Sequence, residues 1–233
     1  MAPATSWAVI LAGGDGARLR PLTRLLSGDD RPKQFCPLAG PRSLLADTMS
    51  RVATVVDPAR TFHVVCSKHE RFYRRDLFGV RPSQVLGQPS SRGTTVAIAY
   101  GLASIRARSP LAHEALVGFF PADHYYADHS AFRRTLGAAY ATAACHPDRI
   151  VLVGAQATEP ETEYGWIQPG LPLASARLTR GTGGSVRSVA GFWEKPSLDL
   201  AADLLLVAAE HVHAEMTRRL DLRPAELRPT NGW

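Results

Sequence analysis

The sequence predicts an α/β protein of Rossmann-like, doubly wound architecture, in which helices cover both faces of a mainly parallel, mixed sheet. Short apolar runs alternate along the chain with longer segments of helical periodicity, as in successive βαβ units. The first apolar run ends in glycines, as a buried strand does before a turn. Hydrophobic residues make up 45% of the 233 residues and charged residues 21%, so a buried core is expected.

The alternation begins at the first strand. Residues 7–12 (WAVILA) are uniformly apolar and predict a buried strand, and residues 43–56 place their apolar side chains on one helical face. Residues 61–66 (TFHVVC) predict a second strand. A polar helix over residues 68–77 and a short strand over residues 84–87 are expected next.

The same pattern continues through the middle of the chain. The spacing of Ala, Ile and Leu predicts a helix over residues 94–106, and residues 115–120 (ALVGFF) predict a strand that stops at Pro121. Residues 130–144 are alanine-rich and helical, and residues 149–155 (RIVLVGA) predict another buried strand. In this architecture, ligands bind at the carboxyl ends of the strands.

The last third of the chain is less regular. Two strand-like pieces, residues 164–168 and 186–193, are separated by a loop rich in Gly, Ser and Arg, and residues 198–220 are helical. The sequence shows neither an internal repeat nor a separate second domain. We therefore expect one domain over residues 1–200, followed by its helical and divergent C-terminal tail over residues 201–233.

Charge and composition exclude several classes of protein. The net charge of +6 comes from scattered basic residues, without the aromatic-interleaved stripe of a nucleic-acid-binding protein, and so predicts no nucleic-acid partner. No apolar run reaches the roughly 18 residues of a membrane span, and residues 1–6 lack the basic start of a secretory signal. The three cysteines lie far apart without metal-ligand spacing, which predicts free thiols in a reducing cytoplasm.

A glycine-rich segment directly follows the first expected strand. Gly13, Gly14 and Gly16 allow backbone N–H groups to approach an anion closely, and Arg18 can bind phosphate oxygens with both arms of its guanidinium. The segment is not a Walker A loop, because no Gly-Lys-Ser/Thr follows, and Leu19 replaces the third glycine of the dinucleotide fingerprint. A plain glycine-rich turn is the structural alternative.

Lysine is rare in this chain, which contains 27 Lys and Arg residues in total. The three lysines are Lys33, Lys68 and Lys195. Where arginine is used almost everywhere else, a lysine can mark a position that needs a compact charge.

Six segments, in order along the chain, resemble the motifs of the sugar-1-phosphate nucleotidylyltransferases, and most closely those of mannose-1-phosphate guanylyltransferases (GDP-mannose pyrophosphorylases). They are LAGGDGARLRPLT at residues 11–23, RPKQF at 31–35, QPSSRGTT at 88–95, PADH at 121–124, ETEYGWI at 161–167 and FWEKP at 192–196. The resemblance implies the nucleotide-diphospho-sugar transferase type of fold, with residues 1–200 as the nucleotidyltransferase domain.

The resemblance also implies a role for individual residues. The expected catalytic residues are Arg18, Lys33, Asp123 and Lys195. Asp123 is also the expected ligand of a catalytic Mg²⁺. The expected nucleotide-binding residues are Leu11, Ala12, Gly13, Gly14, Gly16, Gln88, Arg92, Gly93 and Thr94. The expected sugar-binding residues are Tyr164, Gly165 and Glu194.

Each of these residues also has a structural explanation. Asp123 could be a helix N-cap, and the pair Glu194–Lys195 could be a solvated surface ion pair. Trp166 and Trp193 are better explained as packing residues than as platforms for a base.

The implied reaction transfers GMP from GTP to mannose-1-phosphate and yields GDP-mannose and pyrophosphate. Positioning and charge neutralisation would suffice, without a protein nucleophile. Gln88 and Gly93 stand where many guanylyltransferases have Glu and Asn, so a pyrophosphorylase of the dTDP-, UDP- or ADP-glucose type remains an alternative. Another alternative is a weak or inactive paralogue that binds nucleotide sugars as a regulatory subunit. A homo-oligomer is left open.

The C-terminal part departs from the family pattern. After the FWEKP segment the family has a Trp-Asn-Ser segment and a second aspartate that completes the magnesium site, and neither is found here. Asp199, Asp203 and Asp221 are the available carboxylates. We therefore expect a chain that is truncated or divergent after residue 200.

Overall fold

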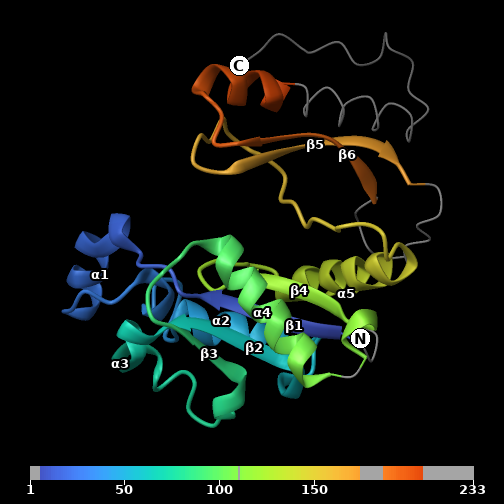
Figure 1. The fold of residues 1–233 in the computed structure, drawn as a ribbon. Coiled ribbons are helices and arrows are strands. Elements are labelled where there is room, and N and C mark those ends of the chain that lie inside the picture. The colour runs from blue at the N-terminus through green and yellow to red at the C-terminus, as the bar shows by residue number, and fades with distance from the viewer. Residues whose placement is uncertain (1–5, 110, 174–185, 207–233) are drawn as a thin grey trace, which may run out of the picture. The chain divides into compact units, whose positions relative to one another are not determined.

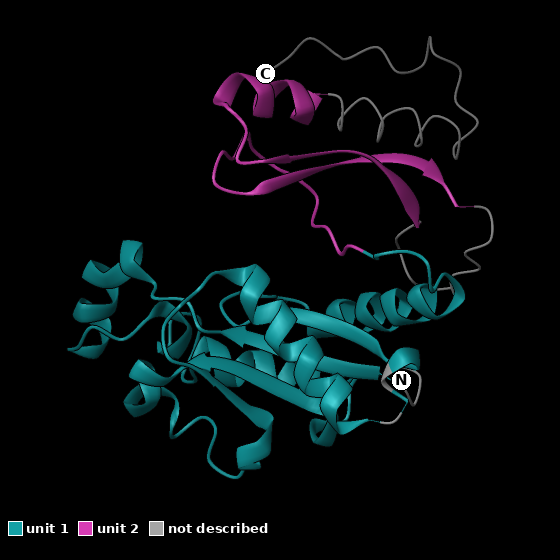
Figure 2. Ribbon diagram, viewed as in Figure 1, with its two compact units in different colours: residues 1–151 teal, residues 152–233 magenta. Residues whose placement is uncertain are grey.

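A computed structural model describes residues 6–109, 111–173 and 186–206. The chain divides into two compact units, residues 1–151 and residues 152–233 (Figure 2). Each unit contains its own sheet, and the two are described in turn.

The first unit is built on a four-stranded parallel sheet. Its strands are β1 (Ser6–Ala12), β2 (Thr61–Cys66), β3 (Val85–Gln88) and β4 (Leu116–Pro121), in the spatial order β3-β2-β1-β4 (Figure 1). Strands β1 and β2 are the central strands, and they are almost uniformly buried because helices cover both of their faces. This explains why their sequences are continuous apolar runs instead of alternating ones.

In the described part of this unit, five α-helices and six 3₁₀ segments connect the strands. The α-helices are α1 (Arg20–Ser27), α2 (Leu44–Val52), α3 (Glu70–Tyr73), α4 (Thr94–Arg108) and α5 (His129–Cys145). The 3₁₀ segments are η1 (Ala17–Leu19), η2 (Lys33–Phe35), η3 (Pro58–Arg60), η4 (Ser67–His69), η5 (Pro82–Gln84) and η6 (Ala112–Glu114). Ser43 caps α2 by accepting from the Ala46 N–H, and Asp128 caps α5 by accepting from the Ala131 N–H.

Strand β1 separates the hydrophobic core into two layers. Ile10 and its even-numbered neighbours pack with Leu45 of α2 and Leu136 of α5. Val9, which points to the opposite face, packs with Ile105 of α4. The prediction of a sheet with helices on both faces is therefore confirmed.

The strand order creates a topological switch point beside β1. From β1 the chain proceeds to β2 and β3 on one side, and α4 then carries it back to β4 on the other side. Because all four strands are parallel, their carboxyl ends meet at one edge of the sheet. Ligands of open α/β sheets bind in the crevice at such a point.

The second unit contains an antiparallel hairpin of β5 (Gly165–Pro172) and β6 (Arg187–Glu194). Trp166 is buried, and its indole Nε1 donates to the Glu161 carbonyl at 2.7 Å, which confirms that it is a packing residue. Residues 198–206 are helical, as predicted. The rest of the helix expected up to residue 220 lies outside the described residues.

Two predicted elements differ from the structure. The helix expected over residues 68–77 is reduced to η4 and the single turn of α3, after which residues 74–79 form turns. The strand expected over residues 149–155 is wrong, because that segment has no regular structure and Ile150 and Val153 are 89% and 53% exposed. An apolar run becomes a strand only where a neighbouring strand pairs with it, and this segment pairs with none in the described part of the chain.

Candidate active site

A cavity of about 230 Å³ lies at the carboxyl ends of the parallel strands. Nine of the residues predicted to bind nucleotide, phosphate or metal line it: Leu11, Gly13, Gly14, Gly16, Lys33, Gln88, Gly93, Thr94 and Asp123. They come from the carboxyl ends of β1 and β3, the loops after β1, β3 and β4, the start of α4, and η2. The topological switch point thus brings together segments that are far apart in sequence.

A buried glutamine fixes the shape of the glycine loop. The Gln34 side chain donates from Nε2 to the carbonyl oxygens of Ala12 at 3.0 Å and Gly14 at 2.7 Å. Gln34 is 4% exposed and lines the cavity, although the sequence analysis did not select it as a site residue. Because Gln34 holds both carbonyl groups, the loop is fixed in one conformation, which suits the binding of an anion by its N–H groups.

Gly16 is required by its surroundings as well as by its conformation. Its φ of +59° lies in the left-handed region, where side chains are disfavoured. An added Cβ would also lie 3.0 Å from the Lys33 backbone nitrogen and 3.1 Å from the Pro32 Cα. Gly16 therefore allows the loop to pack directly against the segment that carries Lys33.

A negative charge in the glycine loop is neutralised from outside the cavity. The Lys68 Nζ lies 2.7 Å from the Asp15 Oδ1, and the His69 Nε2 lies 3.4 Å from the same oxygen. Hydrogen bonding to Lys68 holds the pKa of Asp15 below its ordinary value, and burial lowers the pKa of His69. Lys68 thus offsets a charge that would repel a phosphate.

Lys33 and Asp123 form the charged centre of the cavity. Asp123 follows β4, and its Oδ2 lies 2.6 Å from the Lys33 Nζ. Asp123 caps no helix, because the N-cap of α5 is Asp128. The structural alternative considered for Asp123 is therefore wrong, and its carboxylate points to the site.

The segment after β3 forms another wall of the cavity. Gly93, at a φ of +84°, is the N-cap of α4, so the N–H groups of the first turn of this 15-residue helix begin at the cavity. Ser91, Ala97 and Pro121 also contribute to the lining, although none of them was predicted as a site residue.

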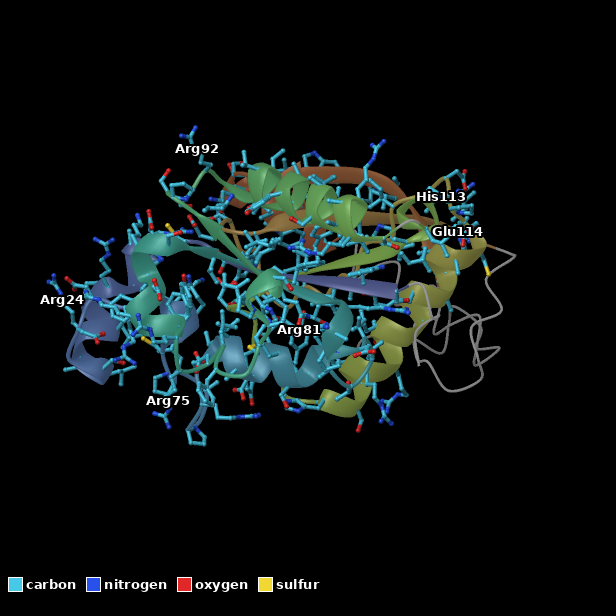
Figure 3. All side chains as sticks on the ribbon, turned by 60° about the horizontal axis from the view of Figure 1, so that its bottom comes forward. Arg24, Arg75, Arg81, Arg92, His113 and Glu114 are labelled. Carbon is cyan, nitrogen blue, oxygen red and sulfur yellow. The ribbon has the colours of Figure 1, made fainter. Side chains whose placement is uncertain are left out.

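Three of the predicted residues of the first unit do not line the cavity. Ala12 is buried beneath the glycine loop, and Arg18 is exposed on η1. Arg92 is exposed, and Figure 3 shows its side chain extending away from the ribbon. A role in nucleotide binding for these side chains stays a prediction.

A larger cavity of about 450 Å³ contains none of the predicted residues. It lies at the amino end of β2, where His63 and Gln84 form part of its lining. Burial lowers the pKa of His63 to about 4, so the imidazole is neutral at ordinary pH. Because the smaller cavity contains the charged and glycine-rich segments, it is the better candidate for chemistry.

The predicted sugar-binding residues lie together in the second unit. Gly165 is paired with Glu194 across the hairpin, and the Lys195 N–H donates to the Tyr164 carbonyl at 3.2 Å. Lys195 has a φ of +48°, the one positive φ among the described residues other than glycine. A strained backbone of this kind is more common at functional sites than elsewhere.

The fold and the cavity together define a class: an α/β protein of the Rossmann-like type with an anion-binding site at its topological switch point. The chain belongs to the nucleotidyl transferase family, whose model matches residues 7–215. This confirms the resemblance seen in the six motifs.

Several known proteins are similar to this chain. The xanthan biosynthesis protein XanB of Xanthomonas campestris pv. campestris is 36% identical over 200 residues, covering 84% of this chain and 38% of that protein. The alginate biosynthesis protein AlgA of Pseudomonas aeruginosa is 35% identical, covering 81% of this chain and 36% of that protein. A mannose-1-phosphate guanylyltransferase of Salmonella montevideo is 34% identical, covering 84% of this chain and 39% of that protein.

A solved structure supports the same grouping. The crystal structure described as mannose-1-phosphate geranyltransferase from Thermus thermophilus is 34% identical with a TM-score of 0.70, and the match covers 86% of this chain and 53% of that one. The chain thus spans less than two fifths of the curated relatives and about half of the solved one. In the described part of the chain, no helix has the length and apolar character needed to cross a membrane.

Proposed function

We propose that this chain transfers GMP from GTP to mannose-1-phosphate, which yields GDP-mannose and pyrophosphate. The observation that carries the proposal is the gathering of nine predicted residues, Lys33 and Asp123 among them, around one cavity at the switch point of the sheet. The name of the Salmonella relative, mannose-1-phosphate guanylyltransferase, supports the choice of substrates.

The reaction needs no nucleophile from the protein. An oxygen of the sugar phosphate attacks the α-phosphorus of the nucleotide and forms a new P–O bond. The bond from that phosphorus to the oxygen bridging the α- and β-phosphates breaks, and its electron pair leaves with pyrophosphate. The protein therefore has to align two anions and stabilise the charge that develops on the leaving group.

The glycine loop and Lys33 are suited to that task. The loop, held by Gln34, presents preorganised N–H donors, and Lys33 supplies a positive charge beside Asp123. The first turn of α4 adds N–H donors from another side of the cavity. Lys195 and Glu194 are expected to bind the sugar phosphate and the sugar hydroxyls.

Asp123 is the residue expected to hold Mg²⁺. Among the described residues, no group of three or more His, Cys, Asp or Glu side chains could hold a metal ion by itself. One carboxylate still fits Mg²⁺, which is commonly bound by one or two carboxylates together with substrate phosphates. When bound, the ion would supply Lewis-acid stabilisation of the phosphate charges.

The proposal is tested by pyrophosphate release from GTP and mannose-1-phosphate with Mg²⁺, in parallel with ATP, UTP and dTTP. We expect GTP to be preferred and Asp123→Ala to lower turnover by about 10²–10³-fold. Asp148→Ala is the matched control, because Asp148 is an exposed carboxylate of the same unit whose charge partner is Arg149.

The base comparison also tests the alternative. Selective turnover with another triphosphate would show that the chain transfers a nucleotide other than GMP, while it would still support a nucleotidyl transfer to a sugar phosphate. No turnover with any pair, in a folded sample that binds a nucleotide sugar, would favour the regulatory subunit.

A further inference from the structure

A buried arginine of α2 contacts the loop that carries Asp123. Arg51 is 3% exposed, and its Nη2 donates to the His124 carbonyl at 2.7 Å. The same Nη2 donates to the Thr48 Oγ1 at 2.8 Å, and this hydroxyl in turn donates to the Ala122 carbonyl at 3.3 Å. The two carbonyl groups that flank Asp123 are therefore both held from one helix.

We infer that Thr48 and Arg51 are positioning residues that set the orientation of Asp123, an inference that rests on the proposed function for its catalytic meaning. Thr48 and Arg51 are three positions apart and so lie on the same face of α2. Their hydrogen bonds to the Ala122 and His124 carbonyls hold the peptide group before Asp123 and the one after His124, so the short stretch that carries Asp123 is anchored at both ends. With its backbone fixed, the Asp123 carboxylate has little freedom except about its own side-chain bonds.

Aromatic rings complete the support of the Arg51 guanidinium. Its Cζ lies 5.2 Å from the centroid of the Tyr126 ring and 5.9 Å from that of the Phe132 ring. These two rings contact each other, with centroids 4.6 Å apart. Tyr126 belongs to the Asp123 loop and Phe132 to α5, so the guanidinium joins α2, the loop and α5 through cation–π contacts.

The charge of Arg51 has no carboxylate partner within ion-pair distance among the described residues. The acidic group with the largest effect on it, Asp47, is itself paired with Arg42 at 2.8 Å. Burial without a paired anion is unfavourable for a guanidinium and lowers the pKa of Arg51. An apolar side chain would fill this space with a smaller desolvation penalty, but it could not donate hydrogen bonds to the Thr48 hydroxyl and the His124 carbonyl.

The inference is tested with a double-mutant cycle. Arg51→Met removes the charge and the donors, Arg51→Lys keeps only the charge, and Thr48→Val removes only the hydroxyl. Each is made alone and together with Asp123→Asn. Arg42→Met is the matched control, since Arg42 lies just before the same helix and its exposed guanidinium pairs with Asp47 instead of contacting the loop.

We expect Arg51→Met to lower kcat about 10–100-fold, because a small misplacement of a catalytic group is costly. Arg51→Lys should recover little of this loss, since the lysine Nζ ends one bond short of the Arg51 Nη2 and an ammonium lacks the planar group that contacts the Tyr126 and Phe132 rings. In the Asp123→Asn background, Arg51→Met should change kcat less than about two-fold, because its effect acts through Asp123.

Two measurements do not require turnover. Hydrogen exchange should accelerate in residues 122–126 of Arg51→Met and Thr48→Val but not in the glycine loop of residues 11–16. The affinity for Mn²⁺–GTP should fall in Arg51→Met with Asp123 present and stay unchanged with Asp123→Asn.

The outcomes separate the inference from the proposed function. Equal losses from Arg51→Met in both backgrounds, or unchanged exchange in residues 122–126, would overturn the inference. A wild-type chain without turnover and without Mn²⁺–GTP binding would overturn the proposed function instead, and the exchange data alone would then decide whether Arg51 and Thr48 hold the loop.

Discussion

Replacing Gln34 by leucine tests whether the glycine loop is preorganised by its buried amide. The side chain is 4% exposed and donates to the carbonyl oxygens of Ala12 and Gly14. In Gln34→Leu the Ala12 carbonyl loses this donor in a buried place, which costs about 1–3 kcal/mol of unfolding free energy. The Gly14 carbonyl is more exposed and can bind water, so it adds little to that loss.

In Gln34→Leu, turnover should fall by more than the loss of unfolding free energy alone would explain. Without Gln34 the loop can rotate its carbonyl groups towards the cavity and turn N–H groups away from it. Losing one preorganised donor of this kind lowers kcat by about 10²–10³-fold. Urea unfolding measures the first effect, and nucleotide affinity with pyrophosphate release measures the second.

Gln84→Leu is a closely matched control. Gln84 is also buried, and its Nε2 donates to the carbonyl oxygens of Pro58 at 2.6 Å and Thr61 at 2.7 Å, in the larger cavity away from the glycine loop. Both variants should lose similar stability, but Gln84→Leu should keep its turnover. If the two variants lose turnover equally at a temperature where both are folded, the positioning role of Gln34 is refuted.

Three further predictions concern charges. Lys68→Met removes the ion-pair partner of Asp15, the carboxylate in the glycine loop, and should weaken nucleotide binding roughly two- to five-fold. This loss of affinity should be smaller at high salt, and Lys68→Arg should retain the affinity. Burial lowers the pKa of His63 from 6.5 to about 4, so the unfolded chain takes up a proton at this residue before the folded chain does. The free energy of unfolding is therefore highest above pH 6.5, and it falls by about 3 kcal/mol as the pH drops towards 4. His63→Phe should flatten the decline of unfolding free energy in that window, and parallel curves for both proteins would contradict the assignment. Lys195→Gly should relieve the left-handed backbone at φ +48° and leave unfolding free energy undiminished while lowering turnover about 10²–10³-fold; a larger stability loss than in Lys195→Ala would be inconsistent with strain at this residue.

Patterns that depend on local burial were predictable from the sequence. Strands β1 and β2 are covered on both faces, so their apolar runs predicted them almost to the residue. The glycine loop was found because it follows such a strand, and Asp123 because the PADH segment resembles a family motif; the rule that ligands bind at the carboxyl ends of strands then predicted one common site.

Features that depend on distant partners were not predictable in this way. Gln34, Thr48 and Arg51 act through carbonyl groups 20 to 74 positions away along the chain. The available signal was the presence of polar side chains at or beside positions expected to be apolar: Thr48 lies on the apolar face of its helix, and Arg51 directly precedes Val52 of that face. Conversely, the apolar run over residues 149–155 could not reveal whether any strand edge would pair with it.

The hairpin of β5 and β6 contains its predicted sugar-binding residues within its own ladder of hydrogen bonds. Gly165 is opposite Glu194, and Lys195 is tied to Tyr164 through the backbone, so a short two-stranded segment fixes their mutual geometry. Under the proposed function, recombination between related genes that exchanged this hairpin whole would replace the predicted sugar-binding residues together, in one step. The glycine loop, encoded some 150 residues earlier, would be inherited unaltered.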